Sequence, residues 1–427
     1  MVSGRNDRPL LALRKTRENR YTLPVLLGCV EQEELTGDFR ILIADSLDEI
    51  TRKAGWQEAI IAFSFMTPNL AQVQEEVERL RKTLYKNSLF LAGGSHATAD
   101  PEGTLQLGFD FVFGGESERT FPDFLRRFLS GKIPQEKIVI EGKRPNLSLD
   151  HPPHYLEQRF FAPIEITRGC LYNCAFCQTP RIFGHSLRHR SPENVATFLK
   201  RAVPYGYLQS KFISPNAFSY GSKSPAEIDL EGIEKFLAAS QEAGIPGIHF
   251  GCYPSEVRPD WVNPEVLALV KKYCQNKTIV LGAQSGSNSL LAKLRRGHTA
   301  EQALTAVRWI RQADFMPHVD FVFGFPEETL EDRRVTLGLM KEIIEEQGAK
   351  IHAHTYMPLP GTPLFRKNPT PLDNQTKNVL REWEKRNRLD GWWKDQEVMA
   401  WRIVEWRDKG WIKGEDEISE CGMRNAG

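Results

Sequence analysis

Three closely spaced cysteines are the residues of this 427-residue sequence with the clearest chemical meaning. Cys170, Cys174 and Cys177 have the spacing Cys-x3-Cys-x2-Cys, so one short loop can bring three thiolates to one metal centre. Thiolate ligands select zinc or an iron–sulfur cluster. A structural zinc site needs four ligands, and neither His185 nor His189 lies at a recognised zinc spacing. Three ligands after an apolar strand fit better with a four-iron cluster that keeps one iron open, and zinc is the alternative.

Composition and charge argue against several classes of partner. Lysine plus arginine number 56 against 55 acidic residues, and a formal net charge of +1 gives no general attraction for nucleic acid or membrane surfaces. No apolar run reaches the ~20 residues that span a bilayer, and residues 1–20 lack the apolar core of a signal peptide. The other cysteines, Cys29, Cys252, Cys274 and Cys421, are scattered singly and form no disulfide framework. We therefore expect a cytoplasmic protein with no membrane span and no nucleic-acid partner.

The N-terminal third alternates apolar runs with helical patterns, which predicts a doubly wound parallel sheet. The expected strands are residues 9–13, 39–44, 59–65, 89–92 and 109–113. Ligands on such sheets bind beyond the carboxyl ends of the strands. The candidate cofactor-binding residues at those ends are Ser64, Thr67, Gly93, Gly94, His96, Gly115 and Glu116. Tight turns without a ligand are the alternative interpretation of the glycine pairs.

A second alternation of strands and helices begins at Pro163, and the cysteine loop follows its first strand. The expected strands are residues 164–167, 211–214, 247–251, 278–282, 318–323 and 350–356. Six of the nine tryptophans then fall in a charged, helical C-terminal stretch: Trp383, Trp392, Trp393, Trp401, Trp406 and Trp411. We expect this stretch to pack onto the second domain, with a substrate lid or partner surface as the alternative.

The segment from Ile166 to Cys177 resembles the cluster-binding signature of the radical S-adenosylmethionine (SAM) superfamily, including Phe176 before the last cysteine. The resemblance implies an open (β/α)6 barrel, a 4Fe-4S cluster on the three cysteines and SAM bound to the open iron through its amine and carboxylate. One electron, from a donor such as flavodoxin or ferredoxin, would then release a 5′-deoxyadenosyl radical.

Later segments extend this resemblance. Gln284-Ser285-Gly286, followed by Arg296, is similar to the Gln-Ser-Gly signature of methylthiotransferases and their relatives. By that resemblance Gln284 and Ser285 bind the SAM ribose or methionine end, and Arg296 pairs with the SAM carboxylate. The segment around Gly324 resembles the Gly-Phe-Pro-Gly-Glu-Thr stretch whose backbone flanks adenine. The family's Gly-Gly-Glu motif is absent, and Asn216 would accept the SAM amine in its place.

The order of the domains resembles the cobalamin-binding-domain class of the superfamily. The expected domains are residues 1–145 (cobalamin-binding-like), 155–368 (barrel) and 372–427 (helical extension). Residues 14–21 lack the Asp-x-His-x-x-Gly motif that supplies a histidine to cobalt. We therefore expect cobalamin to be held without a histidine on its lower face, with the loop of His96 shaping the backbone at the corrin edge.

The resemblance leads to a cobalamin-dependent methyltransferase that acts on an unactivated carbon of a small molecule or peptide. The alternatives are a cobalamin-independent radical enzyme (rearrangement, cyclisation or sulfur insertion) and an iron–sulfur scaffold or redox sensor. A methylthiotransferase of transfer RNA is less favoured because the N-terminal domain lacks that family's three further cysteines.

Residues on the substrate side are less defined. Cys252, Tyr253, Glu256 and Arg258 follow the third expected barrel strand. His352 and His354 alternate on the sixth strand and therefore share one face. Two such histidines are also potential metal ligands, but the sequence shows no third partner for them. The alternative is that they line the barrel without chemistry.

Overall fold

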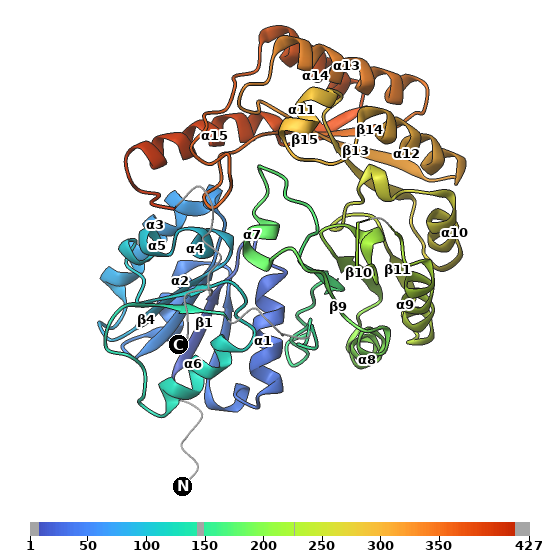
Figure 1. Ribbon diagram of the computed structural model, residues 1–427. Helices are drawn as coiled ribbons and strands as arrows, with labels where there is room; N and C mark the ends of the chain where they lie inside the picture. The colour runs from blue at the N-terminus through green and yellow to red at the C-terminus, as the bar shows by residue number, and fades with distance from the viewer. Residues whose placement is uncertain (1–7, 143–148, 226, 415–427) are drawn as a thin grey trace, which may run out of the picture. The chain divides into compact units, whose positions relative to one another are not determined.

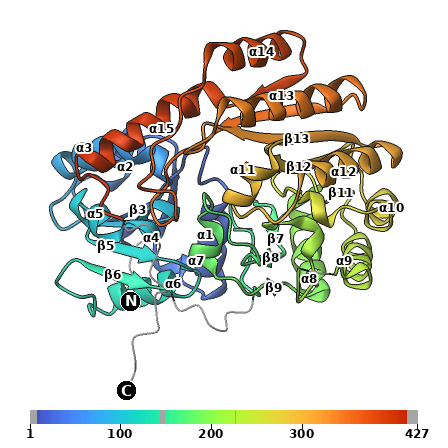
Figure 2. The same cartoon turned by 45° about the horizontal axis from the view of Figure 1, so that its top comes forward.

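The computed structural model describes residues 8–142, 149–225 and 227–414 of the chain. The chain divides into two compact units. The first comprises Met1–Leu147, His151–Ala162 and Arg407–Gly427, and the second comprises Ser148–Asp150 and Pro163–Trp406. Each unit is built on parallel strands with helices around them (Figures 1 and 2), so the predicted α/β fold class is confirmed.

The first unit contains a six-stranded parallel sheet with the order β2-β1-β3-β4-β5-β6. Its strands are β1 (Leu10–Arg14), β2 (Arg40–Ala44), β3 (Ala59–Ser64), β4 (Leu89–Gly93), β5 (Phe111–Gly114) and β6 (Ile138–Glu141). Its helices are α1 (Thr22–Gln32), α2 (Leu47–Ala54), α3 (Leu70–Thr83), α4 (Ser95–Ala99), α5 (Pro101–Gln106) and α6 (Thr120–Leu129). Every residue of β3 is buried, as expected for a strand covered on both faces.

Two helices, α1 and α6, cover one face of this sheet and share a core with it. Leu27 of α1 and Leu125 of α6 are fully buried against Leu11, Ile60 and other apolar strand residues. The four-residue spacing of Val73 and Val77 likewise buries one side of α3. The strand order therefore places the carboxyl ends of β1, β3, β4 and β5 along one edge.

The second unit forms an open barrel of parallel strands. Its strands are β7 (Ile164–Glu165), β10 (Gln209–Ile213), β11 (Gly247–His249), β12 (Thr278–Gln284), β13 (Met316–Phe323), β14 (Lys350–Thr355) and β15 (Leu389–Gly391). They form two ladders, β11-β10-β7 and β12-β13-β14-β15, which a parallel bridge from Val257 to Leu281 connects. No ladder joins β7 to β15 among the described residues, so the barrel is open on that side.

Helices connect and follow these strands (Figure 1). They are α7 (Thr179–Phe183), α8 (Pro192–Ala202), α9 (Leu230–Glu242), α10 (Pro264–Tyr273), α11 (Asn288–Lys293), α12 (Ala300–Gln312), α13 (Leu330–Glu345), α14 (Asn374–Lys385) and α15 (Trp393–Asp408). Reciprocal capping boxes start two of them, with Thr299 and Gln302 on α12 and Thr329 and Asp332 on α13. These side chains satisfy backbone N–H groups that the helices leave unpaired.

The C-terminal stretch is mainly helical, as predicted, and it also contains β15, which pairs in parallel with β14. Three of its tryptophans are buried: Trp383, Trp393 and Trp406. The other three are exposed: Trp392, Trp401 and Trp411. The sequence pattern missed β15 because the strand has three residues, two of them polar or glycine. The predicted domain boundaries stay predictions, and residues 143–145 and 415–427 lie outside the described residues.

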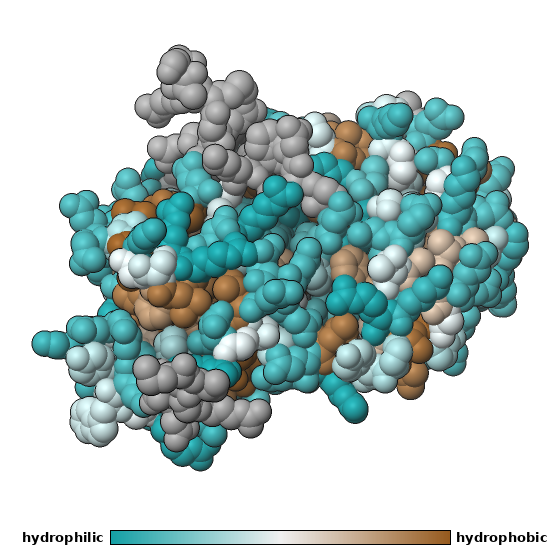
Figure 3. All heavy atoms as spheres, turned by 90° about the horizontal axis from the view of Figure 1, so that it is seen from below, coloured by the Kyte–Doolittle hydropathy of each residue, from teal (hydrophilic) through white to brown (hydrophobic). Residues whose placement is uncertain are grey.

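Hydrophilic residues predominate on the face of the molecule in Figure 3, with smaller hydrophobic patches between them. Among the described residues, none of the helices combines the length and apolar character that crossing a membrane requires.

Candidate functional site

The three cysteines lie on a loop that leaves β8 (Thr167–Arg168), a strand paired in antiparallel fashion with β9 (Arg188–His189). Gly169 opens this loop with φ +88°, and a Cβ atom there would collide with the carbonyl oxygen of Ser186. The backbone N–H of Cys170 donates to the carbonyl of Gly184 over 3.1 Å. The loop is therefore held by its own backbone contacts, without disulfide bonds.

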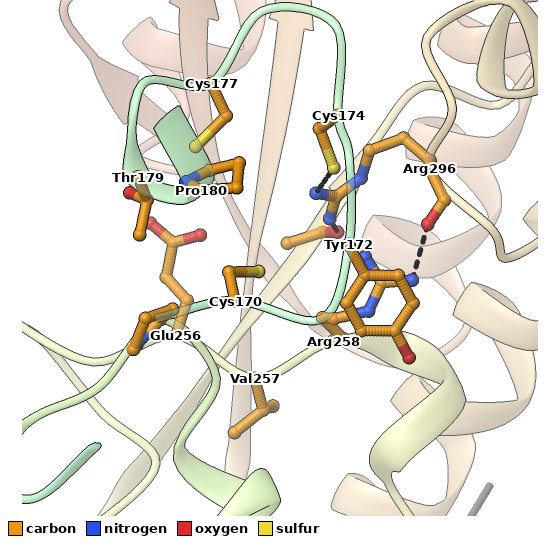
Figure 4. Close-up of a pocket in the computed structure, with 12 residues that line it drawn as sticks. Cys170, Tyr172, Cys174, Cys177, Thr179, Pro180, Glu256, Val257, Arg258 and Arg296 are labelled. Atoms are coloured by element: carbon orange, nitrogen blue, oxygen red, sulfur yellow. Dashed lines mark hydrogen bonds between the residues drawn. The ribbon is translucent and has the colours of Figure 1, made fainter. Parts of the chain in front are cut away.

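All three cysteines line one cavity of about 90 Å³ (Figure 4). The cavity is also lined by Tyr172, Thr179, Pro180, Pro215, Glu256, Val257, Arg258, Gly282 and Arg296. Burial raises the pKa of Cys170 to about 11 and also raises the pKa of Cys177. Buried thiols become thiolates when a cationic centre binds them. This cavity therefore has the donor set that a cluster with three thiolate ligands requires.

Arg296 connects the cysteine loop to β12. Its Nη1 donates a hydrogen bond to Cys174 Sγ over 3.3 Å, and its Nη2 donates to the carbonyl of Gly282 over 2.8 Å. Burial alone would lower the pKa of Arg296, but the neighbouring Cys174 outweighs it and the net pKa is raised. The guanidinium is thus a permanent positive charge at the cavity.

A second arginine lies beside it. The guanidinium carbon of Arg258 lies 3.3 Å from the ring centroid of Tyr172, and its Nη2 donates to the carbonyl oxygen of Arg296 (Figure 4). Arg258 Nη1 and Arg296 Nε are buried donors of cavity-lining residues that lack a hydrogen-bond acceptor within the described residues, and so is Nδ2 of Asn216, the residue after the lining Pro215. Buried donors without acceptors are costly, so this wall fits an anionic ligand such as a carboxylate.

Near Gly282 the cavity also has carboxyl and amide side chains. A Cβ atom there would lie 2.7 Å from Gln284 Nε2 and 3.1 Å from Glu256 Oε2. Gln284 itself has φ +70°, at an irregularity in the register of β12 and β13 that turns its side chain toward this space. Asp320 of β13 is buried, and burial followed by the neighbouring Glu256 raises its pKa well above the usual value. Asp320 therefore keeps its proton to higher pH than an ordinary aspartate does.

Two residues predicted to bind SAM, Ser285 and Gly324, form hydrogen bonds with other residues of the protein. The hydroxyl of Ser285 lies 3.1 Å from Thr336 Oγ1 and accepts the N–H of Ser287, so it secures the turn after β12 against α13. The N–H of Gly324 donates to Glu328 Oε2 over 2.7 Å, and its carbonyl accepts from Thr370. Their contacts to SAM stay predictions.

Phe176 and Asn216 lie nearer to the cysteine cavity. Phe176 packs against Phe325, with ring centroids 5.3 Å apart, and this aromatic cluster includes Tyr356. The side-chain oxygen of Asn216 accepts the backbone N–H of Arg258 over 3.2 Å. The group left free on Asn216 is its NH₂ donor, which suits a carboxylate better than the amine that we expected it to accept.

The predicted residues of the first unit gather at the carboxyl ends of β3 and β4. Thr67 Oγ1 and His96 Nδ1 share a hydrogen bond of 3.0 Å, and the His96 side chain is fully buried against Phe65. Burial lowers the pKa of His96 to about 3, so the ring is neutral. Gly94 has φ +96°, and a Cβ atom there would collide with the backbone of Phe65. The buried His96 side chain therefore links the loop after β4 to the loop after β3 through its hydrogen bond with Thr67.

The neighbouring loops complete this edge. Ser64 ends β3, Gly93 ends β4, and the N–H of Gly115, after β5, donates to Thr98 Oγ1 over 3.0 Å. Glu116 is buried. An open hollow of about 430 Å³ lies at the ends of β1 and β2 and is lined by Arg14, Lys15, Thr16, Arg17, Glu18, Arg20, Asp45 and Gln72. The expected histidine-free segment therefore borders a largely basic hollow.

Sequence reasoning missed part of the cavity. We assigned Glu256 and Arg258 to the substrate side, and they line the cysteine cavity instead. Asp320 was not singled out, although a single acid within the apolar run of β13 was a signal for a functional carboxylate.

Comparisons with known proteins agree with the two units. The family model described as the radical SAM superfamily matches residues 164–340, and that of the B12 binding domain matches residues 38–125. A tRNA-2-methylthio-N(6)-dimethylallyladenosine synthase of Geobacter metallireducens is 28% identical over 302 residues, which cover 68% of this chain and 65% of that protein. The chain thus spans less than two thirds of the length of this curated relative.

Solved structures share the fold. The radical S-adenosylmethionine methyltransferase TsrM from Kitasatospora setae, with cobalamin and a [4Fe-4S] cluster bound, has a TM-score of 0.62 and 16% identity over 84% of this chain and 77% of its own. The cobalamin-dependent S-adenosylmethionine radical enzyme OxsB, with aqua-cobalamin and S-adenosylmethionine bound, has a TM-score of 0.60 and 15% identity over 96% of this chain and 57% of its own. At these identities the likeness extends to the fold alone.

Proposed function

Because the chain belongs to the radical SAM superfamily, in the class with an N-terminal B12-binding domain, we propose that it is a cobalamin-dependent methyltransferase acting on an unactivated carbon. The observation that carries this proposal is the presence of both domains in one chain, with a cavity lined by three cysteines in the second. The cofactors of this class are a 4Fe-4S cluster, SAM and cobalamin; when bound, they supply radical generation and a carrier for the methyl group.

The residues of the cavity have complementary roles in this proposal. Arg258, Arg296 and the amide NH₂ of Asn216 bind the carboxylate of SAM, because their free donors are buried at one wall. Glu256 and Asp320 accept the amine or ribose hydroxyls, because their carboxyl pair supplies acceptors near Gly282. The packed rings of Phe176, Phe325 and Tyr356 exclude water from one side.

The first unit holds cobalamin in this proposal along the carboxyl edge of its sheet. Gly93 and Gly94 allow a planar macrocycle to approach the backbone closely. The basic side chains around the hollow at β1 suit the phosphate of the cobalamin nucleotide loop. Reducing equivalents come from a donor such as flavodoxin or ferredoxin, and the methyl acceptor is a small molecule or peptide.

Sulfur insertion is the second candidate, favoured by the similarity to a methylthiotransferase. Against it, residues 1–145 contain Cys29 as their single cysteine, and this thiol is buried. One cysteine cannot hold a second cluster in that domain. A radical enzyme that does not use cobalamin is distinguished from both by the experiment below.

Purification under anaerobic conditions from cells supplied with hydroxocobalamin tests the proposal. We expect iron and cobalamin absorption bands in the same protein, and formation of methylcobalamin when SAM and a low-potential reductant are added. Cleavage of SAM by a protein that retains no cobalamin would overturn the methyltransferase proposal and favour the cobalamin-independent enzyme. Iron bound at two clusters per chain would favour sulfur insertion.

A further inference from the structure

One row of residues crosses the barrel strands beside the cysteine cavity. The register aligns Gly282 of β12, Asp320 of β13, His352 of β14 and Asp390 of β15. Neighbouring strands lie about 4.8 Å apart, so His352 is about 10 Å from Gly282, which lines the cavity. His318 is two residues before Asp320 and therefore shares its face of the sheet.

This face of the sheet points into the barrel. The alternate residues of β13, Val319, Phe321 and Phe323, are fully buried on the other face, which the outer helices cover. The face of β13 opposite these apolar residues includes the polar residues His318 and Asp320, and the rings of His318 and His352 have centroids 5.6 Å apart. The structure therefore brings two polar partners, His318 and Asp390, to His352, whereas His354 Nδ1 lies 3.2 Å from Gln396 Oε1.

Three of these side chains converge on one point. His352 Nδ1 lies 2.5 Å from Asp390 Oδ1, and His318 Nε2 lies 3.4 Å from the same oxygen. One ligand atom from each residue lies within 4.8 Å of the other two. Two ligands of a tetrahedral ion with bonds of about 2.0–2.1 Å are about 3.4 Å apart. The His318 spacing already matches this value, and the His352 spacing needs to widen by less than about 1 Å.

The contacts around Asp390 and His318 leave one ligand atom of each residue available. Lys350 Nζ binds the other oxygen of Asp390, Oδ2, over 2.7 Å, which leaves Oδ1 for the two imidazoles. His318 Nε2 is buried and has no hydrogen-bond partner within the described residues. Outer contacts of this kind orient a ligating carboxylate.

We propose that His318, His352 and Asp390 bind one divalent transition-metal ion of the zinc class inside the barrel. Two imidazoles and one carboxylate leave a coordination position open, as in catalytic sites. That position faces the interior, where it takes an oxygen or nitrogen atom of a further ligand. The site is independent of the cobalamin chemistry proposed above.

Zinc binding by the full-length chain tests the site. The protein carries Cys170→Ala, Cys174→Ala and Cys177→Ala, has no affinity tag and is made without cobalamin, so that neither the thiolates of the cysteine cavity nor cobalt interfere. Zinc is titrated against a chromophoric chelator, and circular dichroism checks the fold of each variant. We expect one tightly bound zinc per chain. His318→Ala and Asp390→Asn should each weaken binding by more than about 100-fold, because even outer-shell changes cost about 10–100-fold.

The matched control is His249→Ala. His249 is on β11, where its Nε2 is bonded to Gln209 Oε1 over 2.7 Å, outside the proposed ligand set. This variant should keep the zinc affinity of its parent. Absence of stoichiometric zinc in the parent, or equal affinity in the His318 and Asp390 variants and the parent, would overturn the proposal. The cobalt(II) form should also change its visible bands on addition of azide, and unchanged bands would overturn the open position.

Discussion

Arg296 and Cys174 are 122 positions apart in sequence, and their side chains are joined by a hydrogen bond of 3.3 Å from Nη1 to Sγ. This contact places the positive charge that we assign to SAM binding directly against a residue that we assign to the cluster. Charge-assisted donors to thiolate sulfur tune the properties of an iron–sulfur centre. In the proposed function this residue pair would couple SAM binding to the cluster.

Replacing Cys170, Cys174 or Cys177 with Ala should remove a cluster ligand while the fold survives. Each variant should lose iron after anaerobic reconstitution and should no longer form 5′-deoxyadenosine from SAM. Cys29→Ala, which changes a buried thiol of the first unit, should retain both properties. A triple variant that keeps its iron and its SAM cleavage would refute the assignment.

Gln284→Ala and Arg296→Ala should weaken SAM binding without stripping iron. Loss of one charge-assisted hydrogen bond costs about 1.5–3 kcal/mol, which is about ten- to a hundred-fold in affinity. Arg308→Ala is the control, because it removes only a solvent-exposed ion pair with Glu342 outside the cavity; it should leave SAM affinity unchanged. Isothermal titration under anaerobic conditions measures the affinities, and equal values in all three variants and the parent would contradict the site.

Gly282→Ala should also weaken SAM binding, because the new methyl group meets Gln284 Nε2 at 2.7 Å and Glu256 at 3.1 Å. Those flexible groups must move out of their places beside the cavity. Gly338→Ala on α13 is the control, since no atom lies within 4 Å of its added Cβ; it should stabilise the protein by about 0.5–1 kcal/mol. SAM affinity unaffected by Gly282→Ala would show that Gln284 and Glu256 do not bind it.

Asp320 should make stability fall as the pH rises. Its folded pKa is raised by burial and by Glu256, so above about pH 4 the unfolded chain releases a proton that the folded chain keeps. The slope reaches about 1.4 kcal/mol per pH unit until the folded pKa is passed. Asp320→Asn, which still donates to Glu256, should remove this slope. Urea unfolding of the protein without cofactors at pH 5 and pH 7 measures this slope. Asp314→Asn, at an exposed site, is the control and should retain the slope of the parent.

Cobalamin should be held without a histidine on its lower face. His96 is fully buried and bonded to Thr67, so His96→Ala should cost about 1–3 kcal/mol of stability through a lost buried hydrogen bond and a cavity. Electron paramagnetic resonance of the cobalt(II) form should show no nitrogen superhyperfine splitting in either protein. Splitting that disappears in His96→Ala would contradict this prediction.

The sequence by itself determined the parts of this protein that local patterns encode. The spacing of Cys170, Cys174 and Cys177 predicted a cluster loop, and the continuous apolar runs predicted most of the parallel strands of both units, since buried strands need apolar side chains on both faces. No strand was predicted at β6, which pairs in parallel with β5 at the edge of the first sheet. Apolar runs do not reveal short polar strands. For example, β15 has only three residues and forms through its pairing with β14.

The tertiary structure decided which polar side chains meet. Arg258 and Glu256 lie on the cysteine cavity because the loop after β11 folds across it, and no periodicity in that loop specifies the direction of either side chain. Asp390 joins His318 and His352 only through the register of three strands that are far apart in sequence. Contacts of this kind depend on strand order and pairing, which arise from packing of the whole barrel rather than from any local segment.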